Sequence, residues 1–350
     1  MTTLTEKIWQ EFFIEEIFNI LPGKRLTKAD MIAGDTPFIG ASDSNNGVTC
    51  FVGNDNDSAD ENFLSVSYNG SVCQCFYHPY RCLCSDDVKR FHLKNRAGNK
   101  YIYLFMKSII EKQRGKYNYG YKFNETRMRR QKIMLPVNDK GEPDYNFMEN
   151  YVRAVEEKQL QRYRDYVQAL DAAKIPPLNE KIWRPFFIKD LFVTIRNGLQ
   201  VPTGAYVSKE HLIEGDTPRI TVTGNNNGVY GFYHSTDKNY KVHENFISVS
   251  FLGDCFYHPY KASLDMKVHC LKLADRELNR FVALFLIRMF KQMTAVFNYG
   301  DQLSSKDIVN KKIQLPINDS GAPDFEYMEA YVKNSMAAQY RKYLEYLGDD

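Results

Sequence analysis

Hydrophobic and polar positions follow the same plan twice along this chain. Short runs rich in β-branched and aromatic residues come first, among them 63–67 (FLSVS) and 246–250 (FISVS), with Asn-Gly and Gly-Asp turn signals between such runs. A stretch with helical character follows in each half, at 100–113 and 278–294. The pattern predicts an α+β protein with two similar tandem domains, each rich in β-strands and also containing helices.

Each half ends in a long amphipathic helix, in which the apolar residues lie mostly three and four positions apart. These residues are Met148, Val152, Val155, Tyr163, Tyr166, Val167 and Leu170 in the first helix, and Met328, Val332, Met336, Tyr340, Tyr343 and Leu347 in the second. A stripe this narrow suits one helical partner better than a deep core. We therefore expect the two helices to join the domains by packing on each other as an antiparallel coiled coil.

An internal repeat underlies this plan. The repeated segments are EKIW at 6–9 and 180–183, GDTP at 34–37 and 215–218, NNGV at 45–48 and 226–229, CFYHPY at 75–80 and 255–260, and NYG at 118–120 and 298–300. A period near 180 residues is far longer than a solenoid repeat, so we interpret the chain as a duplicated domain.

The repeat and the two helices set the expected boundaries. These are a first domain at 1–145, a first long helix at 146–171, a linker at 172–179, a second domain at 180–325 and a second long helix at 326–350. Pro176 and Pro177 lie in the linker, and because proline cannot continue a helix, we expect the first long helix to end before them.

Length and composition narrow the class of protein. The chain has 350 residues, which is longer than a domain built around a single hydrophobic core usually is. Its 43% of hydrophobic residues exclude wholesale disorder. The most apolar stretch, 281–290, contains Arg288 and is too short to cross a membrane. The first residues lack the basic and then apolar order of a secretory signal, and seven cysteines are not typical of a disulfide scaffold. We therefore expect a cytoplasmic location.

Basic residues are concentrated in one part of each half, although the net charge is only +3. Between 89 and 132 there are 14 Lys and Arg against 2 acidic residues, and between 269 and 312 there are 8 against 4. Tyr117, Tyr119, Tyr121 and Phe123 are interleaved with the first cluster, a mixture that contacts phosphates and stacks against sugars or bases. The expected phosphate contacts are Lys116, Lys122, Arg127, Arg129, Arg130, Lys306, Lys311 and Lys312. The alternative is a solvated helix face beside a packed aromatic turn.

Three patterns suggest chemistry but are incomplete. Cys73, Cys75, Cys82 and Cys84 suggest zinc, yet only Cys255 recurs in the second half. Asp144 with 156–158 (EEK) imitates a metal-dependent nuclease, but 156–158 lies within the expected helix. His78 and His258 have no recurring nucleophile or carboxylate beside them, so we expect them to maintain the fold or touch phosphate. We expect neither a catalytic residue nor a metal ligand in this chain.

The order of the repeated motifs resembles the DNA-specificity (S) subunit of Type I restriction-modification systems. Each half passes from a Trp-containing segment through GDTP and NNGV to Tyr-Gly and Ile-x-Leu-Pro, and then to a long helix. The compact length, together with NYGYK at 118–122 and LPVNDKGEPD at 135–144, is more similar to the smaller S-like subunits of Type IIB systems. The resemblance covers nearly the whole chain.

This resemblance implies a non-catalytic subunit with two target-recognition domains, each of which reads one half of a split site in double-stranded DNA. It also implies partner subunits that carry methyltransferase and endonuclease activity and bind S-adenosylmethionine and Mg²⁺, so no cofactor is expected in this chain. The halves differ after Tyr-Gly, where 301–303 (DQL) replaces 121–123 (YKF) and 307–310 (DIVN) replaces 127–130 (RMRR). Unequal DNA contacts by the two domains are therefore expected.

Comparison of the halves also suggests where bases are read. Loops that differ between the halves are suited to distinguish two half-sites. These loops are 42–44, 53–60 and 81–87 in the first half and 223–225, 234–242 and 261–266 in the second. The expected base-reading residues are Ser42, Asp43, Asn45, Asn46, Tyr121, Thr223, Asn225, Asn226 and Asn227. Two other functions stay open: a small stand-alone nuclease or nucleic-acid-modifying enzyme that uses His78 and His258, and a protein-interaction scaffold.

The long helices generate a prediction about the spacing of the half-sites. The 23 residues from Met148 to Leu170 span about 35 Å at about 1.5 Å per residue, close to one turn of B-form DNA. Inserting four residues after Arg162 and four after Lys342 lengthens each helix by about 6 Å. Selection of bound sites from random duplexes should then give a spacer longer by about two base pairs between unchanged half-sites. An unchanged spacer would mean that the helices do not set the distance.

Overall fold

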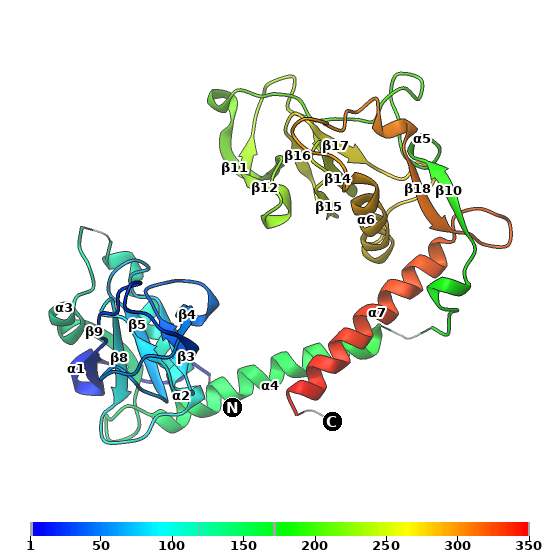
Figure 1. Cartoon of the computed structure of the whole chain (residues 1–350). Helices are drawn as coiled ribbons and strands as arrows, with labels where there is room; N and C mark the ends of the chain where they lie inside the picture. The colour runs from blue at the N-terminus through cyan, green and yellow to red at the C-terminus, as the bar shows by residue number, and fades with distance from the viewer. Residues whose placement is uncertain (1–2, 119, 171–172, 349–350) are drawn as a thin grey trace. The chain divides into compact units, whose positions relative to one another are not determined.

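The computed structural model describes residues 3–118, 120–170 and 173–348, and the chain divides into two compact units at Tyr163 and Arg164 (Figure 1). The first unit contains the first repeat and most of the first long helix. Tyr119 and the predicted boundary positions 1, 171, 172 and 350 lie outside the described residues. None of the described helices has the length and apolar character that crossing a membrane requires.

The first unit contains two sheets and a two-stranded ribbon. The antiparallel sheet has the order β2 (Phe18–Pro22), β8 (Val88–Leu93), β5 (Phe63–Ser67), β6 (Cys75–His78). The second sheet has the order β4 (Val48–Val52), β3 (Ala33–Ile39), β7 (Leu83–Cys84), with β3 and β7 parallel. The ribbon pairs β1 (Trp9–Phe13) with β9 (Lys132–Pro136), so it joins the two ends of the first domain.

The second unit repeats this topology with small differences. One sheet has the order β15 (Cys255–His258), β14 (Phe246–Ser250), β17 (Val268–Leu271). The other has the order β12 (Val229–His234), β11 (Ile213–Ile220), β16 (Ala262–Leu264), β13 (Val242–His243). The ribbon pairs β10 (Trp183–Phe187) with β18 (Lys312–Pro316). The sheets of the two units therefore correspond strand by strand, apart from β2 and β13.

The strand registers of the two units match as well. Phe63 lies opposite His78, and Phe246 lies opposite His258. Trp9 lies opposite Pro136, as Trp183 does opposite Pro316. The predicted runs 63–67 and 246–250 are β5 and β14, whose residues are all buried. The prediction of two similar tandem α+β domains is therefore confirmed.

Helices cover the antiparallel sheets and connect the strands. Besides the long helices, the described α-helices of the first unit are α1 (Ile14–Ile17), α2 (Lys100–Glu111) and α3 (Glu125–Arg130), and those of the second are α5 (Ile188–Leu191) and α6 (Arg280–Thr294). Short 3₁₀ turns are η1 (Asn45–Gly47), η2 (Arg114–Lys116), η3 (Leu178–Glu180), η4 (Lys209–His211), η5 (Asn226–Gly228) and η6 (Ile308–Asn310). The predicted helices at 100–113 and 278–294 are thus α2 and α6, which begin after the capping side chains of Asn99 and Asn279.

The long helices are α4 (Tyr145–Ala169) and α7 (Phe325–Tyr346). We expected their apolar stripes to pack on the opposite helix rather than on a deep core, and the first turns differ from this expectation. Met148 and Met328 are fully buried in the cores of their own units. The reason is that each long helix starts directly beyond the ribbon, where it lies against α2 or α6, as the edge-on contact of Tyr151 with Phe105 illustrates.

The ends of the long helices also differ from the prediction. α7 ends at Tyr346 rather than at 350, because Gly348 adopts a left-handed conformation (φ +77°) and its amide donates to the Glu345 carbonyl. Within the second unit, Tyr166 in the last turn of α4 contacts Tyr340 of α7, with ring centroids 5.8 Å apart. Antiparallel packing along the whole length of the two helices stays a prediction.

The same ion pair fixes the start of the long helix in both units. Lys7 lies 2.6 Å from Asp144, and Lys181 lies 2.7 Å from Asp324, with all four side chains less than one-fifth exposed. The other oxygen of each aspartate accepts a hydrogen bond from an amide in the first helical turn, that of Phe147 in the first unit. Burial on its own would raise the pKa of Asp144, but these hydrogen bonds outweigh it and the pKa is lowered.

The ion pair predicts a pH-dependent loss of stability in D144N. Asparagine still caps the helix, so the substitution removes mainly the bond to Lys7 and should cost the first unit about 1–3 kcal/mol near neutral pH. Because the folded pKa of Asp144 is lowered, this contribution is present above the ordinary pKa of about 4 and is lost as the pH falls through the folded pKa. The difference between D144N and the native chain should therefore shrink below about pH 4.

Urea unfolding followed by tryptophan fluorescence measures this effect. The chain has two tryptophans, Trp9 and Trp183, so a W183F background leaves Trp9 as the reporter of the first unit. The matched control is D139N, which changes an exposed carboxylate in the turn before α4. Equal unfolding midpoints for D144N and D139N would contradict the assigned role of the ion pair.

Candidate nucleic-acid interface

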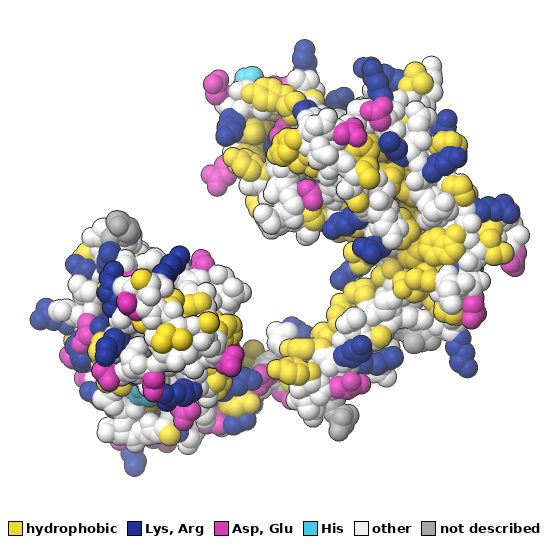
Figure 2. Space-filling model, in the orientation of Figure 1, with side chains coloured by type: hydrophobic (Ala, Val, Ile, Leu, Met, Phe, Trp, Pro, Cys, Tyr) yellow, Lys and Arg dark blue, Asp and Glu magenta, His cyan; other side chains and the backbone are white. Residues whose placement is uncertain are grey.

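The segment between α2 and β9 forms a basic and aromatic pocket in the first unit. α3 begins after Asn124, whose side chain accepts a hydrogen bond from the Arg127 amide. The pocket has a volume of about 490 Å³ and is lined by Tyr117, Tyr121, Asn124, Thr126, Arg127, Arg130 and Gln131. Figure 2 shows Lys and Arg side chains gathered over the part of the first unit that carries α3.

Contacts within the pocket hold its aromatic and cationic groups in place. The Arg127 guanidinium lies 3.8 Å from the centroid of the Tyr121 ring and donates a hydrogen bond to the Lys122 carbonyl. The rings of Tyr117 and Tyr121 are parallel, 5.8 Å apart, and the Tyr117 hydroxyl donates to Gln131. Tyr121 is nevertheless 50% exposed. The pocket therefore presents an ordered aromatic face with a fixed positive charge.

The cations predicted to contact phosphate do not all face this pocket. Arg130 is exposed and lines it, whereas Arg129 forms an ion pair with Glu125 at 2.8 Å. Glu125 also pairs with Lys89, and the hydrogen bonds from Arg129 and Lys89 outweigh burial and lower the pKa of Glu125. Lys116 is exposed and donates to Gln113, and Lys122 is half-buried. Arg127 and Arg130 are thus the guanidinium groups best placed to meet an anion.

The second unit replaces this arrangement. Asp301 stands where the first unit has Tyr121, and the buried Leu303 takes the place of the buried Phe123. The turn η6 replaces α3. The three predicted lysines are held differently from Arg127: Lys306 is exposed, Lys311 lies over Phe297, and Lys312 lies over Phe187. The sequence difference after Tyr-Gly is therefore a difference in local structure.

The Asn-Asn-Gly turns have a backbone reason for recurring. Asn45, Asn46 and Gly47 all have positive φ, and so do Asn226, Asn227 and Gly228. Asparagine and glycine tolerate this left-handed conformation better than other residues. In the first unit Asn46 also donates a hydrogen bond to the Tyr80 hydroxyl at 3.0 Å. The repetition of these asparagines therefore follows from the turn, and their contact with bases stays a prediction.

The other residues predicted to read bases lie on the loops beside these turns. Asp43 and Asn225 are exposed, and Ser42 and Thr223 are half-buried. Ser42 bonds with Ser44 at 3.0 Å, and the Asn225 amide donates to the Thr223 hydroxyl. The structure brings Ser42, Asp43, Asn45 and Asn46 together on one loop, and Thr223, Asn225, Asn226 and Asn227 together on another. It places Tyr121 in the basic pocket instead.

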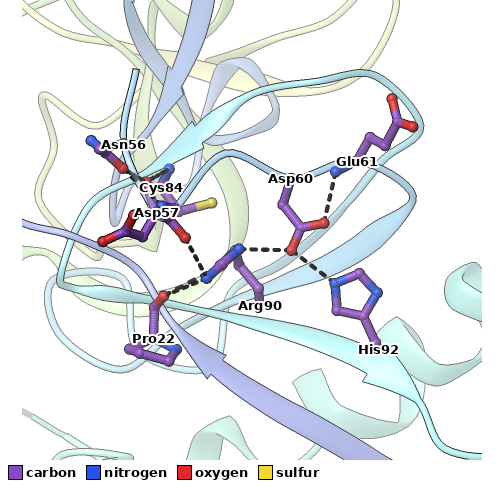
Figure 3. Close-up of polar contacts among 9 residues, drawn as sticks. Pro22, Asn56, Asp57, Asp60, Glu61, Cys84, Arg90 and His92 are labelled. Atoms are coloured by element: carbon purple, nitrogen blue, oxygen red, sulfur yellow. Dashed lines mark hydrogen bonds and ion pairs between the residues drawn. The ribbon is translucent and has the colours of Figure 1, made fainter. Parts of the chain in front are cut away.

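A buried polar network, which the sequence analysis missed, holds the acidic loop 53–60 against the first sheet (Figure 3). Arg90 of β8 donates to Asp60 at 2.8 Å and to the carbonyls of Pro22 and Asp57. His92 lies 2.8 Å from the same Asp60 oxygen. Burial alone would raise the pKa of Asp60, but His92, the Glu61 amide and Arg90 lower it. The signal in the sequence that could have indicated this network is Arg90 and His92, two residues apart and therefore on one face of a strand.

The second unit has its own buried arginine at a different position. Arg219 of β11 is 2% exposed, lies 2.8 Å from Asp265, and approaches the Ala205 carbonyl. Its counterpart in the first unit is Phe38, and the counterpart of Arg90 is Cys270. The two units therefore share a fold but use different charged pairs to hold their loops.

The two histidines of the repeated CFYHPY segment have structural roles. His78 and His258 are 0% exposed, and each bonds with a serine hydroxyl of the neighbouring strand, at 2.9 and 2.8 Å. Burial lowers the pKa of both to about 4, so the imidazoles are neutral at pH 7. Of the two alternatives left by the sequence, a role in the fold agrees with this burial and phosphate contact does not.

The cysteines do not assemble into one metal site. Cys73 and Cys75 belong to the main core of the first unit, whereas Cys82 and Cys84 belong to a different cluster. Burial raises the pKa of Cys73 to about 12 and that of Cys75 well above its usual value, which disfavours the thiolate that zinc needs. Across residues 3–118, 120–170 and 173–348, no group of three or more His, Cys, Asp or Glu side chains is placed to hold a metal ion.

The residues that imitate a nuclease signature are engaged elsewhere. Asp144 binds Lys7 and caps α4, and Glu156 on the same helix binds Lys100. Glu157 and Lys158 also lie on α4 and are exposed. An arrangement of this kind stabilises a helix and its attachment rather than presenting converging carboxylates.

Comparison with known proteins agrees with this geometry. Residues 6–162 and 180–345 each match the family described as Type I restriction modification DNA specificity domain. A curated protein of Heyndrickxia coagulans, Type II restriction enzyme BgcI specificity subunit S.BcgI, is 54% identical over 162 residues. That match covers 46% of this chain and 48% of the relative, so the chain spans about half the length of the curated relative it matches.

The chain also aligns with solved structures of restriction-modification subunits. The Type-I restriction-modification system S subunit from M. genitalium aligns with 99% of this chain and 95% of its own, with a TM-score of 0.53 and 13% identity. The HsdS subunit from Thermoanaerobacter tengcongensis aligns with 95% of this chain and 91% of its own, with a TM-score of 0.34 and 14% identity. The first of these likenesses shows a common fold.

The pocket predicts which arginines govern the salt dependence of DNA binding. Changing Arg127 and Arg130 together to Ala should lower the slope of log affinity against log salt by about 2 units, at roughly 0.9 per lost phosphate contact. The preferred DNA sequence should not change, because phosphate contacts carry no base information. The matched control is R129A, whose guanidinium is bound to Glu125. A slope altered equally by R129A would place the DNA contact on the other face of α3.

Proposed function

We propose, since the chain belongs to the Type I restriction modification DNA specificity domain family, that it is the DNA-recognition subunit of a restriction-modification complex. Each unit reads one half of a bipartite site in double-stranded DNA. The subunit itself is non-catalytic and acts in the cytoplasm. The observation that carries this proposal is one strand framework, present twice with matching registers, that supports two different sets of polar loops.

A repeated framework with divergent loops suits recognition of a split site. Buried residues such as His78 and His258 keep the two frameworks alike, because their packing tolerates little change. The loops that differ carry exposed polar side chains, which can meet base edges in a groove. One fold can therefore present two reading surfaces, and duplication of the domain doubles the length of sequence that is read.

The basic pocket supports DNA rather than a protein as the ligand. Its cations are arginines beside an exposed tyrosine, a combination that binds phosphates and stacks on sugars or bases. In the proposed complex the first unit makes the stronger backbone contacts, because the second unit has Asp301 where Tyr121 stands. Lys306, Lys311 and Lys312 supply the backbone contacts of the second unit.

Methyl transfer and strand cleavage belong to partner subunits in this proposal. The partner binds S-adenosylmethionine and Mg²⁺, and the present chain delivers the DNA sequence to it. Support comes from the family match and from the name of the curated relative, a specificity subunit of a Type II restriction enzyme. The alternative enzyme, which would use His78 and His258, has no support in the geometry, because both imidazoles are enclosed and neutral.

Assays with the chain alone and with its partner test the proposal. The pure chain, mixed with labelled duplex DNA, Mg²⁺ and S-adenosylmethionine, should neither cleave nor methylate the DNA. Together with the subunits that co-purify with it, the chain should select a bipartite motif from random duplexes, whereas the co-purifying subunits alone should select none. Cleavage or methyl transfer by the pure chain would contradict the proposal, and selection of no sequence at all would favour the scaffold alternative.

A further inference from the structure

The segment that follows the CFYHPY repeat holds one exposed cation at the same place in each unit. Arg81 follows Tyr80 in the first unit, and Lys261 follows Tyr260 in the second. Arg81 is 59% exposed along its side chain, and Lys261 is also exposed. The preceding segment is identical in the two halves, whereas this position is not. Position 81 therefore differs between the two halves directly after a segment that they share.

The backbone on both sides of Arg81 is fixed by buried residues. His78 lies three residues before Arg81, is fully buried, and pairs with Phe63 across β5 and β6. Cys82 comes directly after it, is also fully buried, and exchanges two backbone hydrogen bonds with Asp60, at 2.9 and 3.0 Å. The exposed side chain of Arg81 therefore projects from a corner of the backbone, residues 80–82, that has little freedom to move.

The second unit holds Lys261 in the same way. His258 is fully buried opposite Phe246, and Ala262, directly after Lys261, is fully buried opposite His243. The two corners are therefore equivalent in register, although the residues that pair with positions 82 and 262 differ. Within the described part of the chain, Lys261 has no ion-pair partner, whereas Arg81 has one.

The polar network of Figure 3 supports the segment around Arg81 and Cys82 in the first unit. Asp60, which pairs with Cys82 through its backbone, is itself held by the buried Arg90 and by His92. The same acidic loop supplies Asp55, which accepts a hydrogen bond from Arg81 Nη2 at 2.9 Å. The loop therefore positions both the backbone and the guanidinium of the exposed arginine.

We propose that Arg81 is a specificity-determining residue of the first unit and reads a guanine in the major groove of that unit's half-site. This inference rests on the function proposed above. One Nη2 hydrogen is engaged by Asp55, which leaves enough donors to bind guanine O6 and N7 together. Asp55 is a positioning residue, because it orients the guanidinium and does not itself contact the base. Lys261 occupies the matching place in the second unit and offers a single point charge, which defines a base less sharply.

The neighbourhood of Arg81 suits base reading better than backbone contact. Asn46, on the Asn-Asn-Gly turn, donates to the Tyr80 hydroxyl, so a second candidate reading loop adjoins the same corner. The nearby carboxylates of Asp55 and Asp57 are 72% and 93% exposed and would repel a phosphate, whereas a carboxylate can accept a hydrogen bond from the amino group of cytosine. Local charge therefore favours a base edge over the phosphate backbone.

Selection of bound sites from random duplexes, using the chain with its co-purifying subunits, tests the inference. R81A should remove the preference for guanine at one position of one half-site and leave the other half-site unchanged. Affinity for the native site should fall about 5- to 150-fold, the range expected for one bidentate guanine contact. R81K should retain part of the preference, and D55N should weaken it without abolishing binding.

Two controls separate base reading from general effects of charge. K24A removes an exposed cation that pairs with Asp57 of the same loop, and it should leave the preferred sequence unchanged. The double variant R127A/R130A should weaken binding to all sequences alike. If R81A also weakens binding to all sequences alike, or if native and R81A complexes select the same sites, the inference is wrong while the proposed function stands. If the native complex selects no bipartite site, the proposed function itself fails.

Discussion

The ion pair between the first lysine of each repeat and the aspartate before the long helix is the constraint on which each unit depends. Lys7 with Asp144, and Lys181 with Asp324, connect the opening segment of a unit to the start of its helix. Because the same carboxylate caps the helix, one aspartate couples the segment that enters the ribbon to the start of the helix. The direction in which each helix leaves its unit is therefore set by the domain and not by helix propensity.

This constraint explains which parts of the repeat can change. The ribbon, the ion pair and the buried histidines occupy equivalent places in both units, and each depends on a partner in another segment of the unit. The loops between them need only return the chain to the next strand. One unit holds its loop with Arg90 and Asp60, and the other uses Arg219 and Asp265, so buried charge is arranged separately in each loop system. Loop sequence can vary because each network is satisfied locally.

Much of this architecture is predictable because the sequence contains two copies of one domain, which can be compared with each other. The internal repeat and the spacing of apolar residues correctly predict the strands 63–67 and 246–250 and both long helices. Met148 was assigned to the wrong partner, because periodicity shows that a helix has an apolar face but not which element covers it. The network around Arg90 was not foreseen, since it joins residues 22, 57, 60 and 92 through tertiary contacts alone.

The contrast between the units concerns the ordering of cations as well as their number. Arg127 already rests on Tyr121 and on a backbone carbonyl, so binding an anion there costs little side-chain freedom. An exposed lysine such as Lys306 must lose most of its rotamer freedom to make an equivalent contact, and its ammonium is more strongly hydrated. In the proposed function, the unit with ordered arginines therefore supplies more backbone affinity, while the unit whose predicted phosphate contacts are lysines depends more on base contacts. In the proposed function, duplication followed by such divergence would let one fold divide affinity and selectivity unequally between two half-sites.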